Sequence, residues 1–446
     1  MGGTLAPPVR RLILLCGLFF ACAAPAGAGT LFLIDGRGWG HGIGMSQYGA
    51  RGYAENGWPY QRILAHYYRG TELKIIPGRE VRVLLAPMQG NVQISSKKPF
   101  RVVDARGKKR RLAPGTVTLV PGAPKGKLKR LKLPLRFEPG AMPLRLGESA
   151  YRGSLIVHRQ SRKLTVVNRL PLDRYLRGVV PWEMPHDWHP EALKAQAVVA
   201  RSYALATLKP GKLFDVYPDV RSQVYGGIVA EKVSTNRAVG ATAGRVLCWN
   251  GDVATTFYHS TSGGRTAAIA DVWPRATPLP YLVSVPDPHD RSSKHHRWGP
   301  FKLTPDELAL KLKAKDVEDL LVERAPSGRV SRLELETTTG RRTILAQDFR
   351  ELMGLRSTWF NVRVLRLDPH LSRALAARPI KLTGFVRGLS GVRLEQQVNG
   401  GAWSTVRPLG VRPDGRFTTT VRPQRTTSYR LAVAGAAGAA ITVKLR

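Results

Sequence analysis

Cysteine is scarce in this chain of 446 residues, which contains Cys16, Cys22 and Cys248 and no others. The first two fall within a leader-like segment at the N-terminus, so a processed chain would keep Cys248 alone. A single cysteine cannot form a disulfide within its own chain, and it cannot supply a zinc site built from several thiolates. A disulfide-rich fold and a thiolate zinc site are therefore both excluded for the processed chain.

Acidic residues are also few, with 31 Asp and Glu against 70 Lys and Arg, which gives a net charge of +39. Such a charge attracts polyanions, which include nucleic acids, anionic lipids and anionic wall polymers such as teichoic acids. The N-terminus has the pattern of a secretory signal, which favours the wall polymers over nucleic acid: Arg10 and Arg11 precede an apolar run at 12–24 and a small-residue cleavage site at 26–28. That run is too short for a comfortable transmembrane helix. We predict a signal peptide at 1–28, a secreted protein and no nucleic-acid partner.

The apolar pattern predicts an α+β fold. Residues 79–170 contain short runs of alternating apolar and polar residues separated by Gly and Pro, which is typical of strands. Residues 189–208 place alanines and leucines at helical spacing after Pro190, which favours a long helix. From residue 378 onward, short strand patterns alternate with Gly and Pro turns, as in a small immunoglobulin-like sandwich. We predict a main domain at 29–370 and an all-β domain at 378–446.

One carboxylate has an unusual setting. Glu183 lies between Trp182 and Met184, and these three residues lie between Pro181 and Pro185. Because proline fixes its own φ and restricts the residue before it, the pattern predicts a stiff, non-helical loop. The apolar neighbours would shield the carboxyl from water and raise its pKa, as a general acid near neutral pH requires. A solvated glutamate in a proline-flanked connector is the alternative that the local pattern also allows.

Glycines alternate with other residues at 36–44, around Trp39 and His41. The spacing is not G-x-G-x-x-G and no Lys-Ser or Lys-Thr follows, so a phosphate-binding loop is excluded. Alternating glycines allow positive φ and close approach of the backbone around a site. A buried, hydrogen-bonded His41 in a glycine loop is the alternative. The following residues, 45–73, predict a helix, a turn and a second helix.

Several of these segments resemble one family. The sequence GVVPWEMP at 178–185, followed by EALKAQAVVARSYAL at 191–205, is similar to the signature of the SpoIID/LytB family of bacterial cell-wall proteins. The resemblance extends to 36–57, 219–231 and 255–266, and it covers most of residues 35 to 365. In enzymatic members, the glutamate of the P-x-E-M-P motif is the catalytic acid of a lytic transglycosylase that acts on peptidoglycan glycan strands. That residue here is Glu183.

The resemblance implies a β-rich part and a helical part arranged around a glycan groove. It also implies substrate-binding residues in the matching segments: His41, Ser46, Gln47, Gln196, Arg201, Ser222, Gln223, Tyr225, His259 and Ser260. The histidine and hydroxyl at 259–260 can hydrogen-bond a sugar or orient a carboxylic acid. They can equally satisfy the backbone of their own loop.

The order of the motifs departs from the family. In familiar members the glycine motif follows an LRSTWF motif, whereas here it comes first and LRSTWF lies at 355–360. This resembles a circular permutation, which is tolerated because chain termini are often close together. We therefore expect the strand at 31–35 to lie beside the segment at 359–365. We also expect the glycine motif with His41 to face one groove with Glu183.

Some family members bind zinc through the histidine that matches His259 and through downstream cysteines. No cysteine follows His259 in this chain. The remaining histidines of interest have no recognised ligand spacing; they are His186, His189, His289, His295 and His296. We predict that activity needs no metal and no other cofactor.

Three functions stay open at this point. The first is a lytic transglycosylase with Glu183 as its single acid and base, which needs no partner carboxylate of the kind ordinary glycosidases use. The second is a non-enzymatic wall-binding enhancer of an amidase, as the LytB branch of the family is described. The third is a secreted polyanion binder, against which the detailed motifs argue. The expected partners are peptidoglycan glycan strands, anionic wall polymers and a cell-wall amidase, and the expected location is the cell wall or envelope.

Overall fold

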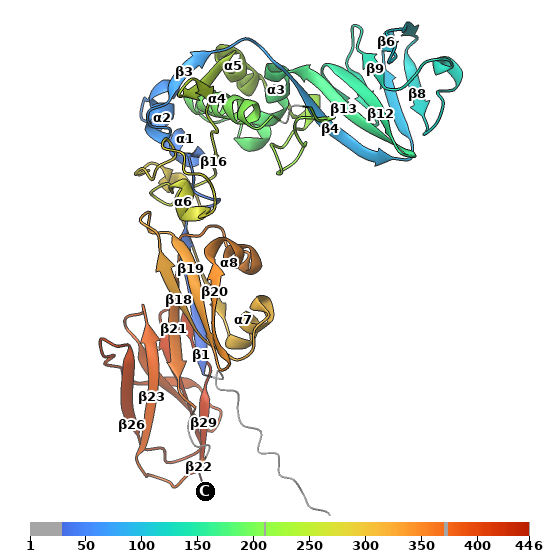
Figure 1. Ribbon diagram of the computed structural model, residues 1–446. Coiled ribbons are helices and arrows are strands. Elements are labelled where there is room, and N and C mark those ends of the chain that lie inside the picture. Colours follow the sequence, from blue (N-terminus) through green and yellow to red (C-terminus); the bar gives the residue numbers. More distant parts are fainter. Residues whose placement is uncertain (1–28, 209–210, 370–372, 446) are drawn as a thin grey trace, which may run out of the picture.

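The computed structural model describes residues 29–208, 211–369 and 373–445, and the predicted signal peptide at 1–28 lies outside these ranges. Figure 1 shows a bent, elongated molecule with helices at the bend, a β-rich arm to one side and a column of sheets below. Helices and strands are both abundant, so the predicted α+β class is confirmed. Among the described residues, no helix is both long and apolar enough to cross a lipid bilayer.

The arm consists of two antiparallel sheets around one apolar core. One sheet has the order β4-β13-β12-β9-β6-β7 and the other the order β11-β10-β5-β8. Alternating apolar residues turn one face of each strand to this core, as the pattern at 79–170 predicted. The elements are β4 (Glu80–Gln89), β5 (Val92–Ser96), β6 (Phe100–Val103), β7 (Lys109–Leu112), β8 (Gly115–Leu119), η1 (Gly126–Leu128), β9 (Leu135–Glu138), β10 (Leu144–Leu146), β11 (Ser149–Tyr151), β12 (Ser154–Gln160) and β13 (Lys163–Pro171).

The helices at the bend carry most of the segments that resemble the family motifs. The long helix expected at 189–208 is confirmed as α4 (Pro190–Ala206), and the His189 side chain accepts a hydrogen bond from the N–H of Glu191 at its start. Its small buried alanines allow α3 to pack closely against it. The other elements here are β2 (Met45–Ser46), α1 (Gln47–Glu55), α2 (Tyr60–Tyr67), β3 (Glu72–Ile75), α3 (Leu172–Glu183), η2 (Gly227–Ala230), α5 (Val233–Ala241), β14 (Arg245–Trp249), β15 (Asp252–Val253), β16 (Tyr258–His259), α6 (Ile269–Val272) and η3 (Asp290–Ser292).

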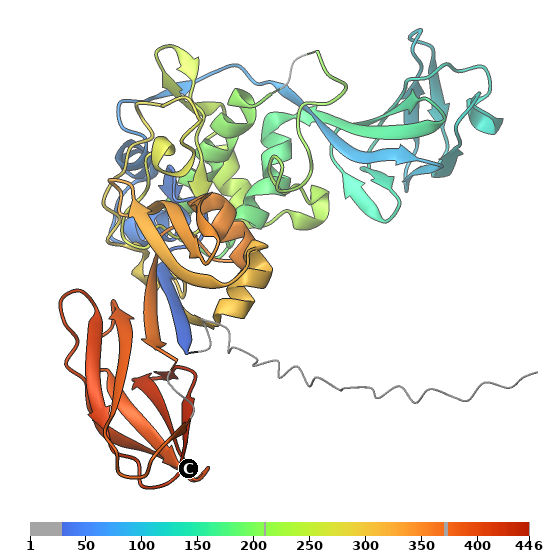
Figure 2. The same cartoon turned by 60° about the horizontal axis from the view of Figure 1, so that its bottom comes forward.

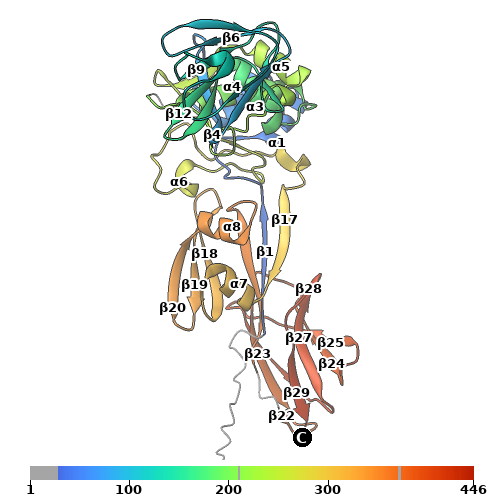
Figure 3. The ribbon, with the colours of Figure 1, turned by 90° about the vertical axis from the view of Figure 1, so that its right-hand side faces the viewer.

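Below the bend, the N-terminal strand lies in the middle of a sheet with two strands from late in the chain. In Figure 3, β1 (Thr30–Arg37) lies beside β17 (Arg297–Leu303). On its other edge β1 pairs with β21 (Phe360–Leu367) in antiparallel register, with Leu31 opposite Leu365. The expected neighbourhood of residues 31–35 and 359–365 is therefore confirmed.

Strand β1 buries both of its faces, because successive side chains of a strand point in opposite directions. Phe32 and Ile34 enter a core with a three-stranded sheet and two helices, and Leu31 and Leu33 enter a second core with the C-terminal strands. The elements of the first core are α7 (Pro305–Leu312), β18 (Val317–Arg324), β19 (Val330–Thr337), β20 (Gly340–Leu345) and α8 (Ala346–Met353). The N-terminal strand thus holds two parts of the column together.

The C-terminal region is all-β, as the sequence predicted, and appears in red in Figure 2. Its strand β23 pairs with β21 and with β26, so the sheet of β1 continues into this region. A second sheet has the order β22-β29-β27-β24-β25. The division into domains near residues 370 and 378 stays a prediction. The elements are β22 (Arg373–Ala374), β23 (Ile380–Arg387), β24 (Arg393–Val398), β25 (Trp403–Pro408), β26 (Arg416–Val421), β27 (Thr427–Val433), β28 (Ala436–Ala437) and β29 (Ile441–Leu445).

Candidate functional site

Glu183 is the last residue of α3, and Pro181 lies inside the same helix. The predicted stiff, non-helical loop is therefore wrong. The fixed φ of proline is close to the helical value, so in the last turn Pro181 removes one backbone donor without ending the helix. The helix closes beyond it, because the N–H of Met184 donates to the carbonyl of Val180 at 3.0 Å. Helix α3 therefore delivers the carboxylate from a rigid element.

The two apolar neighbours of Glu183 differ in their environment. Met184 is buried, as expected, but Trp182 is 60% exposed and does not seal the carboxyl from water. Its indole lies against Gly226, where an added Cβ would come within 2.1 Å of the indole nitrogen. A glycine is needed there because any side chain would displace the ring. Trp182 therefore offers an exposed aromatic surface beside the acid.

Burial raises the pKa of the Glu183 carboxyl, and hydrogen bonding with Tyr258 and with the N–H of Val224 lowers it by a smaller amount. The Val224 nitrogen lies 3.4 Å from Oε1 of Glu183. The partial negative charge at the C-terminal end of α3 also disfavours an ionised carboxylate. The net upward shift of the pKa favours a protonated acid at a pH where exposed glutamates are ionised. Such a carboxyl can donate a proton to a leaving group.

Three tyrosines surround this carboxyl. Burial raises the pKa of Tyr258, Tyr175 and Tyr203, and the negative charge of Glu183 raises each further. Oη of Tyr258 accepts a hydrogen bond from Nε2 of Gln223 at 3.2 Å, which leaves the tyrosine's own proton free to point at Glu183. Oε1 of Gln223 in turn accepts from Oη of Tyr175 at 3.4 Å. Gln223 thus orients the hydroxyl that contacts the acid.

Gln47 connects the segment after the glycine motif to the acid. Its Nε2 donates to the backbone carbonyl of Glu183 at 2.8 Å and lies 3.3 Å from Oε1 of Gln196 on α4. The last carbonyls of a helix have no partner within the helix, so Gln47 satisfies one of them at the end of α3. Gln196 is completely buried, and its Nε2 has no hydrogen-bond partner among the described residues. Two of the expected substrate-binding glutamines therefore meet directly behind Glu183.

Four other expected site residues hold the scaffold together. Arg201 is buried, forms an ion pair with Asp173 at 2.8 Å and donates to backbone carbonyls of α5 and β14. The remaining three bond to their own surroundings. Ser46 caps α1 through the N–H of Gly49, Ser222 accepts from the N–H of Tyr217, and Tyr225 donates to Asn168. None of these contacts involves Glu183.

His41 and His259 lie together on the other side of β16 from Glu183. Tyr258 and His259 are adjacent on this strand and therefore point to opposite faces. Nδ1 of His259 lies 3.2 Å from the carbonyl oxygen of Ile43, and the rings of His41 and His259 are 5.6 Å apart. Burial lowers the pKa of both, that of His41 to about 3, so both are neutral at physiological pH.

The contacts do not show His41 and Glu183 facing one groove, which was the expectation. The glycine motif reaches the acid through Gln47, whereas His41 packs near Trp273 with ring centres 5.3 Å apart. Ser260 lies in the same region as His259, with its Oγ 3.2 Å from Oγ1 of the next residue.

The residues that sequence reasoning missed are Tyr258 and Val224. Both lie within segments that resemble the family, and each is next to a residue that was selected instead, His259 or Gln223. The strand β16 has two residues, so no sequence alternation shows which of its side chains faces the acid. In the part of the chain that the structure describes, no group of three or more His, Cys, Asp or Glu side chains is placed to hold a metal ion.

Comparison with known families and proteins finds matches that include the segment of α3, α4 and the following loop. The SpoIID family model, described as "Stage II sporulation protein", matches residues 160–249. The chain is 30% identical over 247 residues to stage II sporulation protein D of Bacillus amyloliquefaciens, which covers 51% of this chain and 68% of that protein. It is 28% identical over 214 residues to the protein of the same name from Bacillus subtilis (strain 168), covering 44% and 61%.

A third relative has a different name. The chain is 43% identical over 116 residues to the amidase enhancer of Bacillus subtilis (strain 168), covering 26% of this chain and 15% of that protein. The fold and site therefore define an α+β protein with a partly buried acid of raised pKa at a helix end. The chain belongs to the SpoIID/LytB family. Since it spans only a small part of the amidase enhancer, the activity and partners of such relatives come to this chain only as proposals.

Proposed function

We propose that this protein is secreted to the cell wall and cleaves peptidoglycan glycan strands as a lytic transglycosylase. The observation that carries the proposal is the partly buried carboxyl of Glu183, whose pKa is raised by burial while the N–H of Val224 and the hydroxyl of Tyr258 hold it in place. The family membership and the match of residues 160–249, which include this acid, support the same reading.

The chemistry needs one group that acts first as an acid and then as a base. Protonated Glu183 gives its proton to the glycosidic oxygen between N-acetylmuramic acid and N-acetylglucosamine, and the C1–O bond breaks. The carboxylate then accepts the proton of the C6 hydroxyl of the muramic acid residue, and that oxygen bonds to C1. The product is a 1,6-anhydro ring, no water is consumed, and Glu183 ends protonated as it began.

The surroundings of Glu183 suit this cycle. Ordinary glycosidases place two carboxylates on either side of the bond. The pKa of Glu183 is shifted by burial and by hydrogen bonds with Tyr258 and Val224. No second carboxylate contributes to the shift. The two hydrogen bonds favour the ionised form, so they stabilise the carboxylate that exists between the two proton transfers.

A second function is favoured by one observation, the 43% identity to a protein named amidase enhancer. In this reading the protein binds wall glycan and raises the activity of a cell-wall amidase without cleaving a bond itself. The net charge of +39 supports binding to anionic wall polymers in either reading.

Mass spectrometry of peptidoglycan digested with the purified protein tests the proposal. Intact sacculi and glycan strands stripped of stem peptides are both offered as substrates. Release of 1,6-anhydro-muramyl products that disappears in the Glu183→Gln variant supports the transglycosylase. No product from either substrate, together with faster hydrolysis by an added amidase, supports the enhancer instead.

A further inference from the structure

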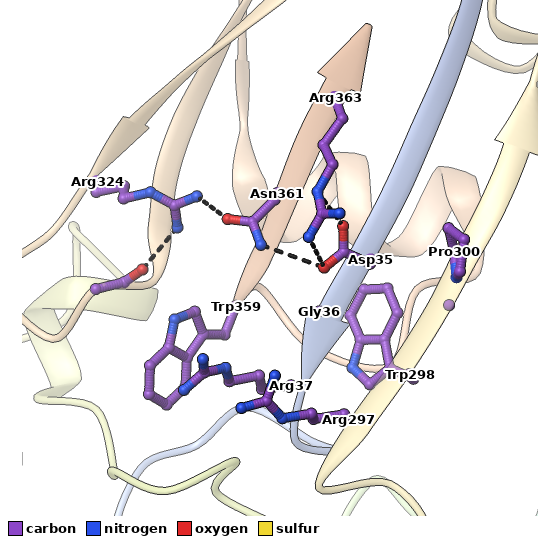
Figure 4. Close-up of a pocket in the computed structure, with 12 residues that line it drawn as sticks. Asp35, Gly36, Arg37, Arg297, Trp298, Pro300, Arg324, Trp359, Asn361 and Arg363 are labelled. Atoms are coloured by element: carbon purple, nitrogen blue, oxygen red, sulfur yellow. Dashed lines mark hydrogen bonds and ion pairs between the residues drawn. The ribbon is translucent and has the colours of Figure 1, made fainter. Parts of the chain in front are cut away.

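A second site lies in the sheet of β1, away from α3 and Glu183. A pocket of about 620 Å³ opens where β1 ends and where β17 and β21 begin, beside the turn between β18 and β19. It is drawn in Figure 4, and its volume is in the range of small-ligand sites. Four arginines line it and one carboxylate: Arg37, Arg297, Arg324, Arg363 and Asp35.

Two of the four arginines are already neutralised or bonded. Arg363 forms an ion pair with Asp35 at 2.9 Å, and Asn361 donates to the same carboxylate at 3.3 Å. Arg324 donates to the carbonyls of Gly328 and Phe360 and to Oδ1 of Asn361. The dashed lines across the top of Figure 4 mark part of this network. Arg363 and Asn361 are thus the partners of the carboxylate that lines the pocket.

Arg37 and Arg297 remain without such partners. They face each other directly across the antiparallel pair β1–β17, and their side chains therefore project from the same face. Neither guanidinium forms a hydrogen bond or an ion pair with another described residue, although that of Arg37 lies 5.4 Å from the centre of the Trp359 ring. Like charges directly opposite each other destabilise a sheet. A cross-strand arginine pair in a pocket is therefore suited to an anion that bridges both guanidinium groups.

The remaining walls are aromatic. Trp298 lies over Gly36, where an added Cβ would be 2.3 Å from its ring, and its indole nitrogen donates to the carbonyl of Gly38 at 2.9 Å. Trp359 forms the opposite wall in Figure 4. Trp298 is buried and forms one wall, whereas the partly exposed ring of Trp359 gives apolar area for the C–H face of a sugar. Planar guanidinium groups bind carboxylate or phosphate through two hydrogen bonds.

We propose that this pocket binds an acidic saccharide unit of a wall polymer through Arg37 and Arg297. The anionic group can be the carboxylate of a muramic acid residue that has lost its stem peptide, or the phosphate of a teichoic acid. The choice of a wall polymer rests on the proposed function, but binding at this pocket does not require that Glu183 cleaves anything. The site would anchor the protein on the polymer at a distance from the acid.

The test is equilibrium binding of the full chain carrying Glu183→Gln, so that cleavage cannot change the ligand during the measurement. The probes are peptide-free glycan strands, the same strands with their carboxyl groups reduced to alcohols, purified teichoic acid, and a DNA duplex. Arg297→Gln and Arg37→Gln remove one guanidinium each, and Arg297→Lys keeps the charge but loses the planar fork. Lys302→Gln, an exposed residue on the same strand β17 but outside the pocket, is the matched control.

We expect each Gln variant to weaken binding to one of the two wall polymers about tenfold or more, which is the effect of about 1.4 kcal/mol. Lys302→Gln should change it less than twofold, and Arg297→Lys should fall in between. If the Gln variants weaken binding to the peptide-free glycan but not to the reduced glycan, the anionic group is the muramic acid carboxylate. If they weaken binding to teichoic acid, the anionic group is a phosphate. Unchanged binding in both Gln variants, an equal loss in the Lys302 control, or dependence seen with DNA alone overturns the proposal. Unaltered thermal unfolding of the variants confirms that the fold is intact.

Discussion

Nε2 of Gln47 lies 2.8 Å from the backbone carbonyl oxygen of Glu183, although 136 positions separate the two residues in the sequence. This hydrogen bond joins the start of α1 to the end of α3. It satisfies a carbonyl that the helix itself leaves unpaired. The segment that follows the displaced glycine motif therefore meets the candidate acid at its backbone, and it fixes where α3 ends.

Replacing Gln47 by Met should therefore affect stability and activity together. Met has a similar length but cannot donate, so the Glu183 carbonyl loses its partner at a cost of about 1 kcal/mol in the free energy of unfolding. A small displacement of the carboxyl should also slow glycan cleavage. Chemical denaturation and product release measure the two effects. A variant that loses stability but keeps full activity would restrict Gln47 to a structural role.

The variant Glu183→Gln should retain the fold and lose catalysis. An amide matches the size of a neutral carboxylic acid, but it has no proton to give to the leaving oxygen. General acid catalysis contributes roughly a hundred- to ten-thousand-fold, and the loss should be near the upper end because one residue serves in both steps. Release of 1,6-anhydro products is measured beside Asp187→Asn, an exposed carboxylate on the same connection. Similar rates for wild type and Glu183→Gln would show that Glu183 is not the general acid.

Tyr258→Phe should move the pH profile of cleavage. The hydrogen bond with Tyr258 lowers the pKa of Glu183, so its loss should raise that pKa further. The first step needs protonated Glu183, and activity therefore falls as the pH rises through its pKa. In the variant this alkaline limb should therefore shift to higher pH.

Tyr225→Phe is the matched control for this shift. It removes a hydroxyl that donates to Asn168 at 2.9 Å, and that hydroxyl is not among the groups that shift the pKa of Glu183. Its alkaline limb should coincide with that of the wild type. If both variants shift the limb equally, the effect belongs to general loosening of the site and not to Tyr258.

Trp182→Ala should weaken substrate binding more than it slows the chemical step. The side chain is 60% exposed beside the acid, so its removal should change stability by no more than about 0.5 kcal/mol. Loss of an aromatic surface for a sugar ring should raise KM several-fold with kcat nearly unchanged, as expected when binding energy is removed equally from ground and transition states. Val229→Ala, 77% exposed on the adjacent turn, is the comparison. An unchanged KM would mean that no sugar packs on Trp182.

Asp287→Asn should change how stability depends on pH. Burial, and then the charge of Asp290, raise the pKa of Asp287 from 3.8 to about 7. The folded protein therefore binds more protons than the unfolded chain between about pH 4 and pH 7. The stability from this group is fully present below that range and is lost as the pH rises through about 7. The amide cannot ionise and can still accept the hydrogen bond that Tyr67 donates at 2.9 Å, so this loss should disappear.

The measurement is the difference in unfolding free energy between wild type and Asp287→Asn from pH 4 to 8. The difference is needed because His41, whose pKa is lowered to about 3, acts in the opposite direction and adds stability as the pH rises towards 6.5. His41 is present in both proteins, so its contribution cancels. Parallel curves for the two proteins would show that Asp287 is ionised throughout.

The amino-acid sequence determined several features by itself, because local patterns control them. Helical spacing after Pro190 gave α4 nearly at its observed bounds, and alternation at 79–170 gave the strands of the arm. The order of the motifs led to the pairing of residues 31–35 with 359–365, which the antiparallel register of β1 and β21 confirms. Linear motifs were also enough to select Glu183 and to indicate the family.

The tertiary structure alone decided what surrounds the acid. The two prolines predicted a loop, but packing of α3 against α4 keeps Glu183 helical, and Pro181 fits the final turn. Only the path of β16 decides that Tyr258, and not His259, faces the carboxyl, and only the fold buries Arg201 against Asp173. The physical reason is that burial, hydrogen-bond partners and pKa depend on segments that are distant in the chain, which no local pattern records.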